Sequence, residues 1–252
     1  MGMMSGRVAM ITGAGGGIGR AAAMVFAREG ARLLLCDIAD DAVGRTVANV
    51  RELGGDAVAM VGDISLKTDV QGFVDRAITE WGTLDAAFNN AGITGPLHPI
   101  VDYPDEWFER TVAVNLRGTW NCIQAQVPAM LRTGGGAIVN ASSCAGAVGS
   151  PGMAVYAATK HAILGLTKAV ALENAAAGVR VNALLPGVID TQQPRAFMAN
   201  APELLESLIA AMPIGRLGQA EEVAEAALWL CSDRASLVTG HGLAVDGGYL
   251  AQ

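Results

Sequence analysis

Apolar runs and helix-like stretches alternate along the whole chain. The first apolar run is Val8–Ile11, and a helix-like stretch at Ile18–Arg28 follows a glycine-rich turn. The run at Arg32–Asp37 contains four apolar residues in succession, which is typical of a strand covered by helices on both faces. The same alternation predicts further strands at 57–61, 84–88, 136–141, 179–184 and 242–246, and further helices at 40–53, 66–81, 102–132, 154–177, 202–212 and 220–231.

The residues at the helix ends support these boundaries. Gly82 follows the 66–81 stretch, where a glycine commonly ends a helix. Before the longest stretch, Asp102 is the expected cap, with Pro104 and Asp105 in the first turn. We therefore expect one continuous helix from Asp102 to about Arg132.

Strands joined by helical crossovers define the fold class. Such connections produce a parallel sheet with helices on both faces. The sequence contains no linker, low-complexity tract or fixed-period repeat. We therefore predict an α/β protein whose residues 1–252 form a single-domain Rossmann-like, doubly wound parallel sheet of about seven strands.

Composition and charge narrow the possible partners. The net charge of −7 and the absence of a Lys/Arg cluster argue against nucleic acid and against an anionic membrane surface. Apolar runs are shorter than the roughly 20 residues that cross a bilayer. The chain begins without a recognisable targeting segment, so we expect a cytoplasmic protein.

The cysteines and histidines do not have the spacing of metal ligands. Cysteines this widely separated are expected to be buried free thiols, and isolated histidines are expected at the surface or hydrogen-bonded. We therefore expect no metal site. The residues concerned are Cys36, Cys122, Cys144, Cys231, His98, His161 and His241.

A glycine-rich segment, Thr12–Gly19, lies between the first strand and the first helix. It fits the pattern Gly13-x-x-x-Gly17-x-Gly19, with Ile18 inside it. A pyrophosphate at a helix N-terminus meets free N–H groups and the positive end of the helix dipole, and glycines let the backbone approach it. A plain tight turn is the alternative interpretation, but the position after the first strand favours a dinucleotide site.

Asp37 ends the second strand, where an acidic residue can bind the adenosine ribose hydroxyls. An ordinary strand-end or helix-capping aspartate is the alternative. A 2′-phosphate at this position would meet the carboxylate, and the following residues, Ile38 to Asp41, include no Arg or Lys. Arg20 is the nearest cation, and we expect it to point away from the ribose. The sequence therefore predicts NAD rather than NADP.

Together these segments resemble the short-chain dehydrogenase/reductase family over essentially the whole chain. The resemblance rests on the glycine loop, on Asn89-Asn90-Ala91-Gly92, on Tyr156 with Lys160, and on the ending Asp246-Gly247-Gly248. It implies a catalytic set of Asn115, Ser143, Tyr156 and Lys160. It also implies a cofactor site of Gly13, Gly17, Ile18, Gly19, Asp37, Asp63, Ile64, Asn90, Ala91, Gly92, Tyr156, Lys160, Pro186, Gly187, Val188, Ile189 and Thr191.

The catalytic set has a physical logic. Tyr156 and Lys160 are four positions apart, so they project from one face of a helix. A nearby ammonium lowers the pKa of a phenol, so Tyr156 can exchange a proton with a substrate oxygen that Ser143 holds. In the family, the residue matching Asn115 helps to hold a water linked to the lysine. These residues predict hydride transfer between NAD and a secondary alcohol or ketone.

Two other functions remain open. One is a nicotinamide-assisted epimerase or dehydratase of the same family. The other is a dinucleotide-binding protein without turnover, although such a protein does not need the Tyr156–Lys160 pair.

Apolar residues in the variable loops suggest an apolar and perhaps cyclic substrate. The alternative is that they only pack over the core. We expect 188–215 to form a loop and helix that cover the substrate. Small residues on helix 154–177, together with the family's usual pairing of this helix, predict a homotetramer. The expected substrate wall is Cys144, Val148, Met153, Phe197 and Met198.

Overall fold

The computed structural model describes residues 2–192 and 202–252. Its centre is a parallel sheet of seven strands in the order β3-β2-β1-β4-β5-β6-β7. The chain therefore crosses from one half of the sheet to the other after β3, as the predicted doubly wound fold requires. The strands are β1 (Val8–Thr12), β2 (Arg32–Asp37), β3 (Asp56–Val61), β4 (Ala86–Asn89), β5 (Gly136–Ala141), β6 (Val179–Pro186) and β7 (Gly242–Val245).

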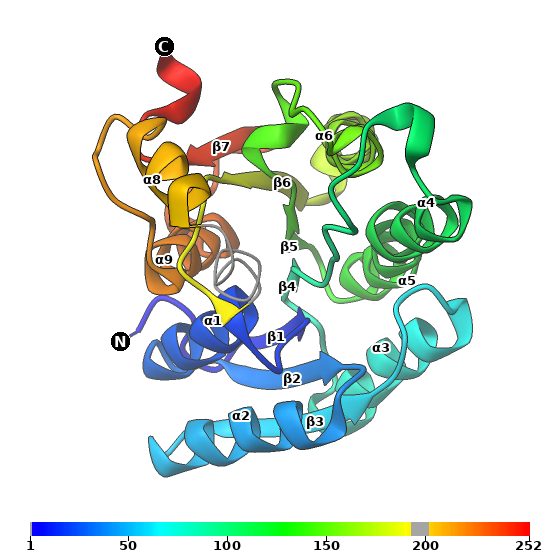
Figure 1. Cartoon of the computed structure of the whole chain (residues 1–252). Helices are drawn as coiled ribbons and strands as arrows, with labels where there is room; N and C mark the ends of the chain where they lie inside the picture. Colours follow the sequence, from blue (N-terminus) through cyan, green and yellow to red (C-terminus); the bar gives the residue numbers. More distant parts are fainter. Residues whose placement is uncertain (1, 193–201) are drawn as a thin grey trace.

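Helices cover both faces of the sheet, as the sequence predicted (Figure 1). One core packs α1, α2 and α9 against the sheet, and the other packs α3, α5 and α6 against its opposite face. The helices are α1 (Gly17–Arg28), α2 (Asp40–Glu52), α3 (Lys67–Trp81), α4 (Asp105–Thr111), α5 (Gly118–Arg132), α6 (Ala154–Asn174), α8 (Pro202–Ala210) and α9 (Ala220–Cys231).

The expected continuous helix from Asp102 to Arg132 is wrong in its start and in its middle. Asp102 ends a separate 3₁₀ turn, and α4 begins at Asp105 with Pro104 as its extended N-cap residue. Proline disfavours a helical conformation in the residue before it, which separates the turn from the helix. In the middle, Val112–Arg117 forms a π-helical segment that joins α4 to α5.

The other boundaries agree with the prediction to within two or three residues. The stop at Gly82 is confirmed, because this residue has φ +79° in the left-handed region that favours glycine. The 154–177 stretch is α6 followed by a 3₁₀ turn, Ala175–Ala177.

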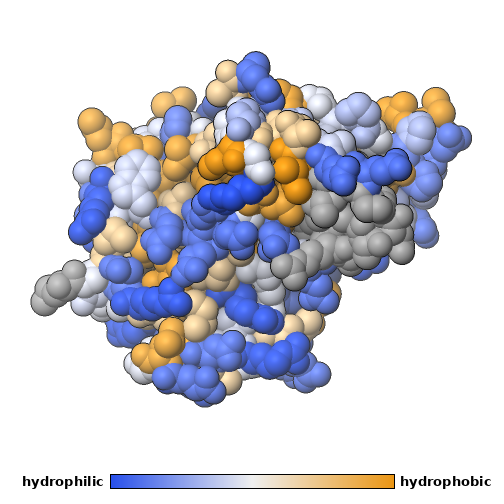
Figure 2. Space-filling model, turned by 60° about the vertical axis from the view of Figure 1, so that its left-hand side comes forward, coloured by the Kyte–Doolittle hydropathy of each residue, from blue (hydrophilic) through white to orange (hydrophobic). Residues whose placement is uncertain are grey.

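The surface mixes hydrophilic and apolar residues. In the face shown in Figure 2, hydrophilic residues dominate the lower half and apolar residues gather in the upper half. Among the described residues, no helix is both long enough and apolar enough to span a membrane. All four cysteines are buried as free thiols, as predicted.

Candidate active site

The glycine loop between β1 and α1 is shaped by close backbone contacts. A methyl group at Gly19 would lie 2.0 Å from the carbonyl oxygen of Gly13, and one at Gly13 would lie 2.9 Å from Cα of Ala91. No described side chain caps the N-terminus of α1, since the N-cap residue is Gly16. Exposed N–H groups at the positive end of a helix, reached through glycines, fit the pyrophosphate of a dinucleotide.

The Asn90–Gly92 segment after β4 is tied to this loop. Thr12 Oγ1 accepts hydrogen bonds from the backbone N–H groups of Asn90 and Ala91, both at 3.1 Å. The Asn90 side chain donates to the carbonyl oxygens of Thr12 and Gly13 at 3.1 and 3.3 Å. The end of β4 therefore fixes the conformation of the loop at the end of β1.

Asp37 faces the glycine loop from the end of β2. Its carboxylate accepts hydrogen bonds from the N–H groups of Gly15 at 2.8 Å and Ala39 at 3.0 Å. The guanidinium of Arg20 donates to the carbonyl oxygen of Gly15 on the same loop. A half-buried carboxylate at this edge has the chemistry required to accept hydrogen bonds from ribose hydroxyls.

The remaining residues of the expected cofactor site occupy neighbouring loops. Asp63 accepts a hydrogen bond from the N–H of Ser65 at 2.8 Å, and the carbonyl oxygen of Ile64 accepts one from Asn121 at 3.0 Å. A methyl group at Gly17 would lie 3.4 Å from Thr191 Cγ2, which brings the segment after β6 to the glycine loop.

That segment after β6 is itself held by backbone contacts. Gly187 N–H donates to Val245 at 3.0 Å, and the carbonyl oxygen of Val188 accepts from Gly218 at 3.0 Å. Ile189 is buried and forms an isolated bridge with Gly218. Pro186 ends β6, so this segment starts at the carboxyl edge of the sheet.

Tyr156 and Lys160 lie near the start of α6, beside the end of β5. Lys160 is buried, and its Nζ donates to the carbonyl oxygen of Ala141 at 2.7 Å and lies 5.5 Å from the centre of the Tyr156 ring. The Ser143 hydroxyl forms a hydrogen bond with the Tyr156 phenol that lowers the phenol's pKa. The structure therefore brings these predicted catalytic residues together.

Asn115 lies in the π-helical segment, where its amide makes three hydrogen bonds. Its Oδ1 accepts from the N–H of Ile93 at 2.8 Å, and its Nδ2 donates to the carbonyl oxygen of Ile93 at 2.8 Å and to Thr159 Oγ1 at 3.2 Å. A methyl group at Gly92 would lie 3.2 Å from Asn115 Oδ1 and 3.4 Å from Lys160 Nζ. Asn115 and Lys160 therefore flank the same glycine.

Burial shifts Tyr156 and Lys160 toward their neutral forms. It lowers the pKa of Lys160 to about 8, because an ammonium without bulk water is disfavoured. It also raises the pKa of Tyr156, and the Ser143 hydrogen bond offsets this rise only in part. The net direction for the Tyr156 pKa is opposite to the one expected from an ammonium alone, because the loss of water outweighs the Ser143 hydrogen bond.

The expected substrate wall is only partly described. The N–H of His98 donates to Gly152 at 3.1 Å, which places the loop after β4 beside the loop that precedes α6. Val148 is exposed and Met153 half-buried on that second loop. Phe197 and Met198 lie outside the described residues.

The Cys144 thiol contacts the end of β6 and Asp246. Its Sγ lies 3.7 Å from the Leu185 carbonyl oxygen and 3.7 Å from Asp246 Oδ2. Burial and the Asp246 carboxylate raise its pKa to about 12. Asp246 also accepts from the N–H groups of Gly248 and Leu250 at 2.9 Å, so it links the residue after Ser143 to the end of the chain.

The histidines take no part in this site. His98, His161 and His241 are exposed, and His161 Nδ1 lies 2.9 Å from the Ala157 carbonyl oxygen. Within the described ranges, no group of three or more His, Cys, Asp or Glu side chains could hold a metal ion.

Sequence reasoning missed several residues that organise the site. Thr12 holds the segment after β4, and Thr159 accepts from Asn115 while donating to the Tyr156 carbonyl oxygen at 2.8 Å. Thr12 opens the glycine-rich segment and Thr159 directly precedes Lys160, so a hydroxyl residue within or beside each motif was the available signal. Ile93 pairs with the Asn115 side chain through its backbone N–H and C=O groups, and a pattern of residue types cannot predict such a contact.

Residues 13–250 match a family model described as enoyl-(acyl carrier protein) reductase. Among curated proteins, the chain is 42% identical to an A-factor type γ-butyrolactone 1′-reductase of Streptomyces virginiae, over 98% of this chain and 97% of that protein. It is 41% identical to a cyclohexanol dehydrogenase of an Acinetobacter species, over 98% of this chain and 96% of the relative.

A solved structure shares the whole fold. The carveol dehydrogenase of Mycobacterium avium, crystallised with NAD, superimposes with a TM-score of 0.95. The two chains are 29% identical, and each is covered completely. A likeness of this extent covers the glycine loop, the segment after β4 and the start of α6.

The buried ammonium should make stability depend on pH. The pKa of Lys160 is about 8 in the folded chain and 10.5 in a free lysine, so the unfolded chain binds more protons between these values. Stability should therefore rise with pH across this window, by on the order of 3 kcal/mol from this group. In Lys160→Met this rise should be lost. The free energy of unfolding of the variant should therefore increase relative to that of the wild type as pH falls from 10.5 to 8.

The measurement is denaturant unfolding of the cofactor-free protein at a series of pH values. Lys168→Met, at an exposed position of the same helix, is the matched control and should show no comparable change. Parallel curves for the wild type and Lys160→Met would show that the ammonium is well solvated in the folded protein.

Proposed function

Because this chain belongs to the short-chain dehydrogenase/reductase family, we propose that it is an NAD-dependent oxidoreductase of secondary alcohols and ketones. The observation that carries the proposal is the gathering of Ser143, Tyr156 and Lys160 at the sheet edge that holds the glycine loop. An alcohol carbon bound there lies within reach of both a proton-transfer group and the dinucleotide site.

The chain's own residues divide the work. Gly13–Gly19 and the N-terminus of α1 hold the pyrophosphate, and Asp37 receives the adenosine ribose. When bound, the nicotinamide supplies or takes up the hydride and, in its oxidised form, adds a positive charge. Ser143 holds the substrate oxygen, while Tyr156 donates the proton to a ketone oxygen or accepts it from an alcohol. Lys160 favours the phenolate when it is charged.

An apolar, cyclic substrate is the class we propose. Val148 and Met153 offer apolar surface on the loop before α6, and one relative at 41% identity is a cyclohexanol dehydrogenase. Segment 188–215 is proposed to cover the substrate. Its described part includes α8 and the buried Met212. Two positions after Met212, the N–H of Ile214 donates to the carbonyl oxygen of Gly247 at 3.0 Å.

Two alternatives are separated by direct tests. An epimerase or dehydratase would convert its substrate with no net change in the near-ultraviolet absorbance of reduced nicotinamide. A non-catalytic binding protein would bind NAD but turn over none of a panel of cyclic alcohols and ketones. The full set of Asn115, Ser143, Tyr156 and Lys160 argues against this second alternative.

Tyr156→Phe should bind NAD nearly as well as the wild type and lose most of its turnover. Only the ionisable oxygen is removed, and a general acid–base group contributes about 10²- to 10⁴-fold. Stopped-flow absorbance with the best substrate of the panel, together with a calorimetric NAD titration, measures both quantities. A Phe variant with near-wild-type kcat would remove Tyr156 from the mechanism.

Asp37→Ala should narrow the preference for NAD over NADP by on the order of a hundredfold in the ratio of the two kcat/KM values. In the wild type, a 2′-phosphate would meet the carboxylate and lose a hydrogen-bonding hydroxyl. Asp41→Ala removes the same charge at an exposed position of α2 and should leave the ratio unchanged. Equal use of both cofactors by the wild type would refute the assignment of Asp37.

We also propose a homotetramer. Phe108, Trp120 and Leu172 are 46, 52 and 83% exposed on α4, α5 and α6, and these apolar side chains become buried when the helices pair across a two-fold axis. Light scattering at micromolar concentration should give a tetramer mass, and Trp120→Asp should lower it. A monomeric mass for the wild type would contradict the proposal.

A further inference from the structure

Consecutive residues of β5 and the loop after it each bind helix α6. Asn140 Nδ2 donates to Thr167 Oγ1 at 3.0 Å. The carbonyl oxygen of Ala141 accepts from Lys160 Nζ at 2.7 Å, and Ser142 Oγ donates to the carbonyl oxygen of Lys160 at 2.8 Å. The next residue, Ser143, reaches Tyr156. We call residues 140–142 the β5 strap.

The first residue of the strap is itself held rigidly. Asn140 pairs in register with Asn89 across β4 and β5, and its Oδ1 accepts from Asn89 Nδ2 at 2.9 Å. Asn89 in turn exchanges hydrogen bonds of 3.0 and 2.7 Å with Gln126 of α5. All of these side chains are buried, so the Asn140 amide has one orientation in which every partner is satisfied.

The contacts lie on the face of α6 that carries the catalytic lysine. Thr167 follows Lys160 by seven positions, which is close to two full helical turns. One strap contact is therefore made at the level of the catalytic pair and another two turns further along. Two fixed points on one face prevent the helix from rotating about its axis.

The Ser142 contact is enclosed. A methyl group at Gly146 would lie 2.3 Å from Ser142 Oγ and 2.8 Å from the carbonyl oxygen of Lys160. Ser142 is itself buried. The hydroxyl therefore sits in a dry position, where a polar group without its partner is costly.

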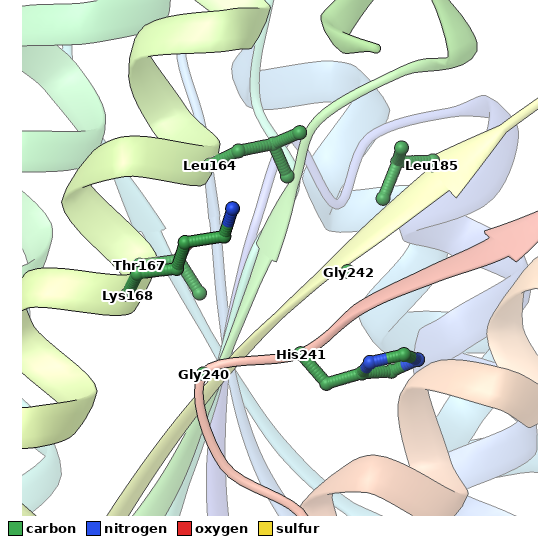
Figure 3. A pocket seen from close by; sticks show the side chains of 7 residues that line it. All are labelled: Leu164, Thr167, Lys168, Leu185, Gly240, His241 and Gly242. Atoms are coloured by element: carbon green, nitrogen blue, oxygen red, sulfur yellow. The ribbon is translucent and has the colours of Figure 1, made fainter.

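Thr167 is buried beside a surface hollow. A hollow of about 290 Å³ lies between α6 and β7, and Thr167 lines it together with Leu164, Lys168 and Gly242 (Figure 3). His241 lines it as well, and the figure shows its ring turned away from Lys168. The hydrogen bond from Asn140 fixes the buried Thr167 side chain at this point of the helix.

We propose that Asn140, Ser142 and Thr167 are positioning residues that fix the rotation of α6, and so place Tyr156 and Lys160 against Ser143. This inference rests on the proposed oxidoreductase function. None of the three residues touches the reacting atoms in this role. They act through the helix, because a misplacement on the order of 1 Å at the reacting groups costs about a hundredfold in rate.

The first test compares two substitutions at Thr167. Thr167→Val keeps the shape but removes the acceptor for Asn140, whereas Thr167→Ser keeps the hydroxyl and removes a methyl group. If Thr167 is a positioning residue, Thr167→Val should lower kcat at least about tenfold with little change in KM for NAD, and Thr167→Ser should keep kcat near the wild-type value. If only packing matters, Val will be the milder variant in both kcat and thermal stability, and the proposal fails.

The second test uses matched serines. Ser142→Ala removes the donor to Lys160, and Ser232→Ala removes an equally buried hydroxyl at the C-terminus of α9, which donates to the Trp229 carbonyl oxygen at 2.8 Å. Positioning predicts a lower kcat and a shifted pH profile for Ser142→Ala alone. Equal kinetic effects in variants with an equal loss of thermal stability would refute it.

A readout without turnover separates this inference from the proposed function. When the strap is loosened, water should reach Lys160 and move its pKa from about 8 toward 10.5. The rise of unfolding free energy with pH should therefore shift its onset to higher pH and become smaller in Ser142→Ala and not in Ser232→Ala. If no substrate is turned over but this shift appears, the proposed function is refuted and the positioning role of the β5 strap is supported. If the shift is absent, the positioning role of the β5 strap is refuted.

Discussion

The charge of Lys160 has to be placed where water is scarce, and much of the structure around it serves this requirement. An ammonium in such a position is disfavoured unless acceptors surround it. The carbonyl oxygen of Ala141 supplies one acceptor at 2.7 Å, and the side without a Cβ at Gly92 leaves the amide of Asn115 close by. The end of β5 therefore supplies the acceptor for the buried cation, and Gly92 leaves room beside both Lys160 and Asn115.

A continuous set of contacts joins the glycine loop to helix α6. Thr12 binds the N–H groups that follow β4, and the same segment presents Ile93 to Asn115. Asn115 donates to Thr159, which donates to the carbonyl oxygen of Tyr156. The loop that fits the dinucleotide and the residues that fit the substrate are therefore parts of one hydrogen-bonded unit.

The sequence predicted what depends on local pattern. The apolar run Arg32–Asp37 and the spacing of Tyr156 and Lys160 were sufficient for the strand and the shared helix face. The π-helical segment could not be predicted, because it is accompanied by the pairing of Asn115 with the distant Ile93. The partner of Asn140 was equally hidden, because the 27 positions between it and Thr167 are bridged only by the tertiary fold.

The electrostatics of the pair bear on the direction of proton transfer. Burial moves the pKa of Lys160 down to about 8 and that of Tyr156 up, so both groups shift toward neutrality in the chain alone. A protonated phenol next to Ser143 is ready to donate to a ketone oxygen. The reverse reaction needs the phenolate, which requires either higher pH or an added positive charge beside the ring. Burial therefore keeps the Tyr156 phenol protonated near neutral pH, and formation of the phenolate depends on positive charge that arrives with binding.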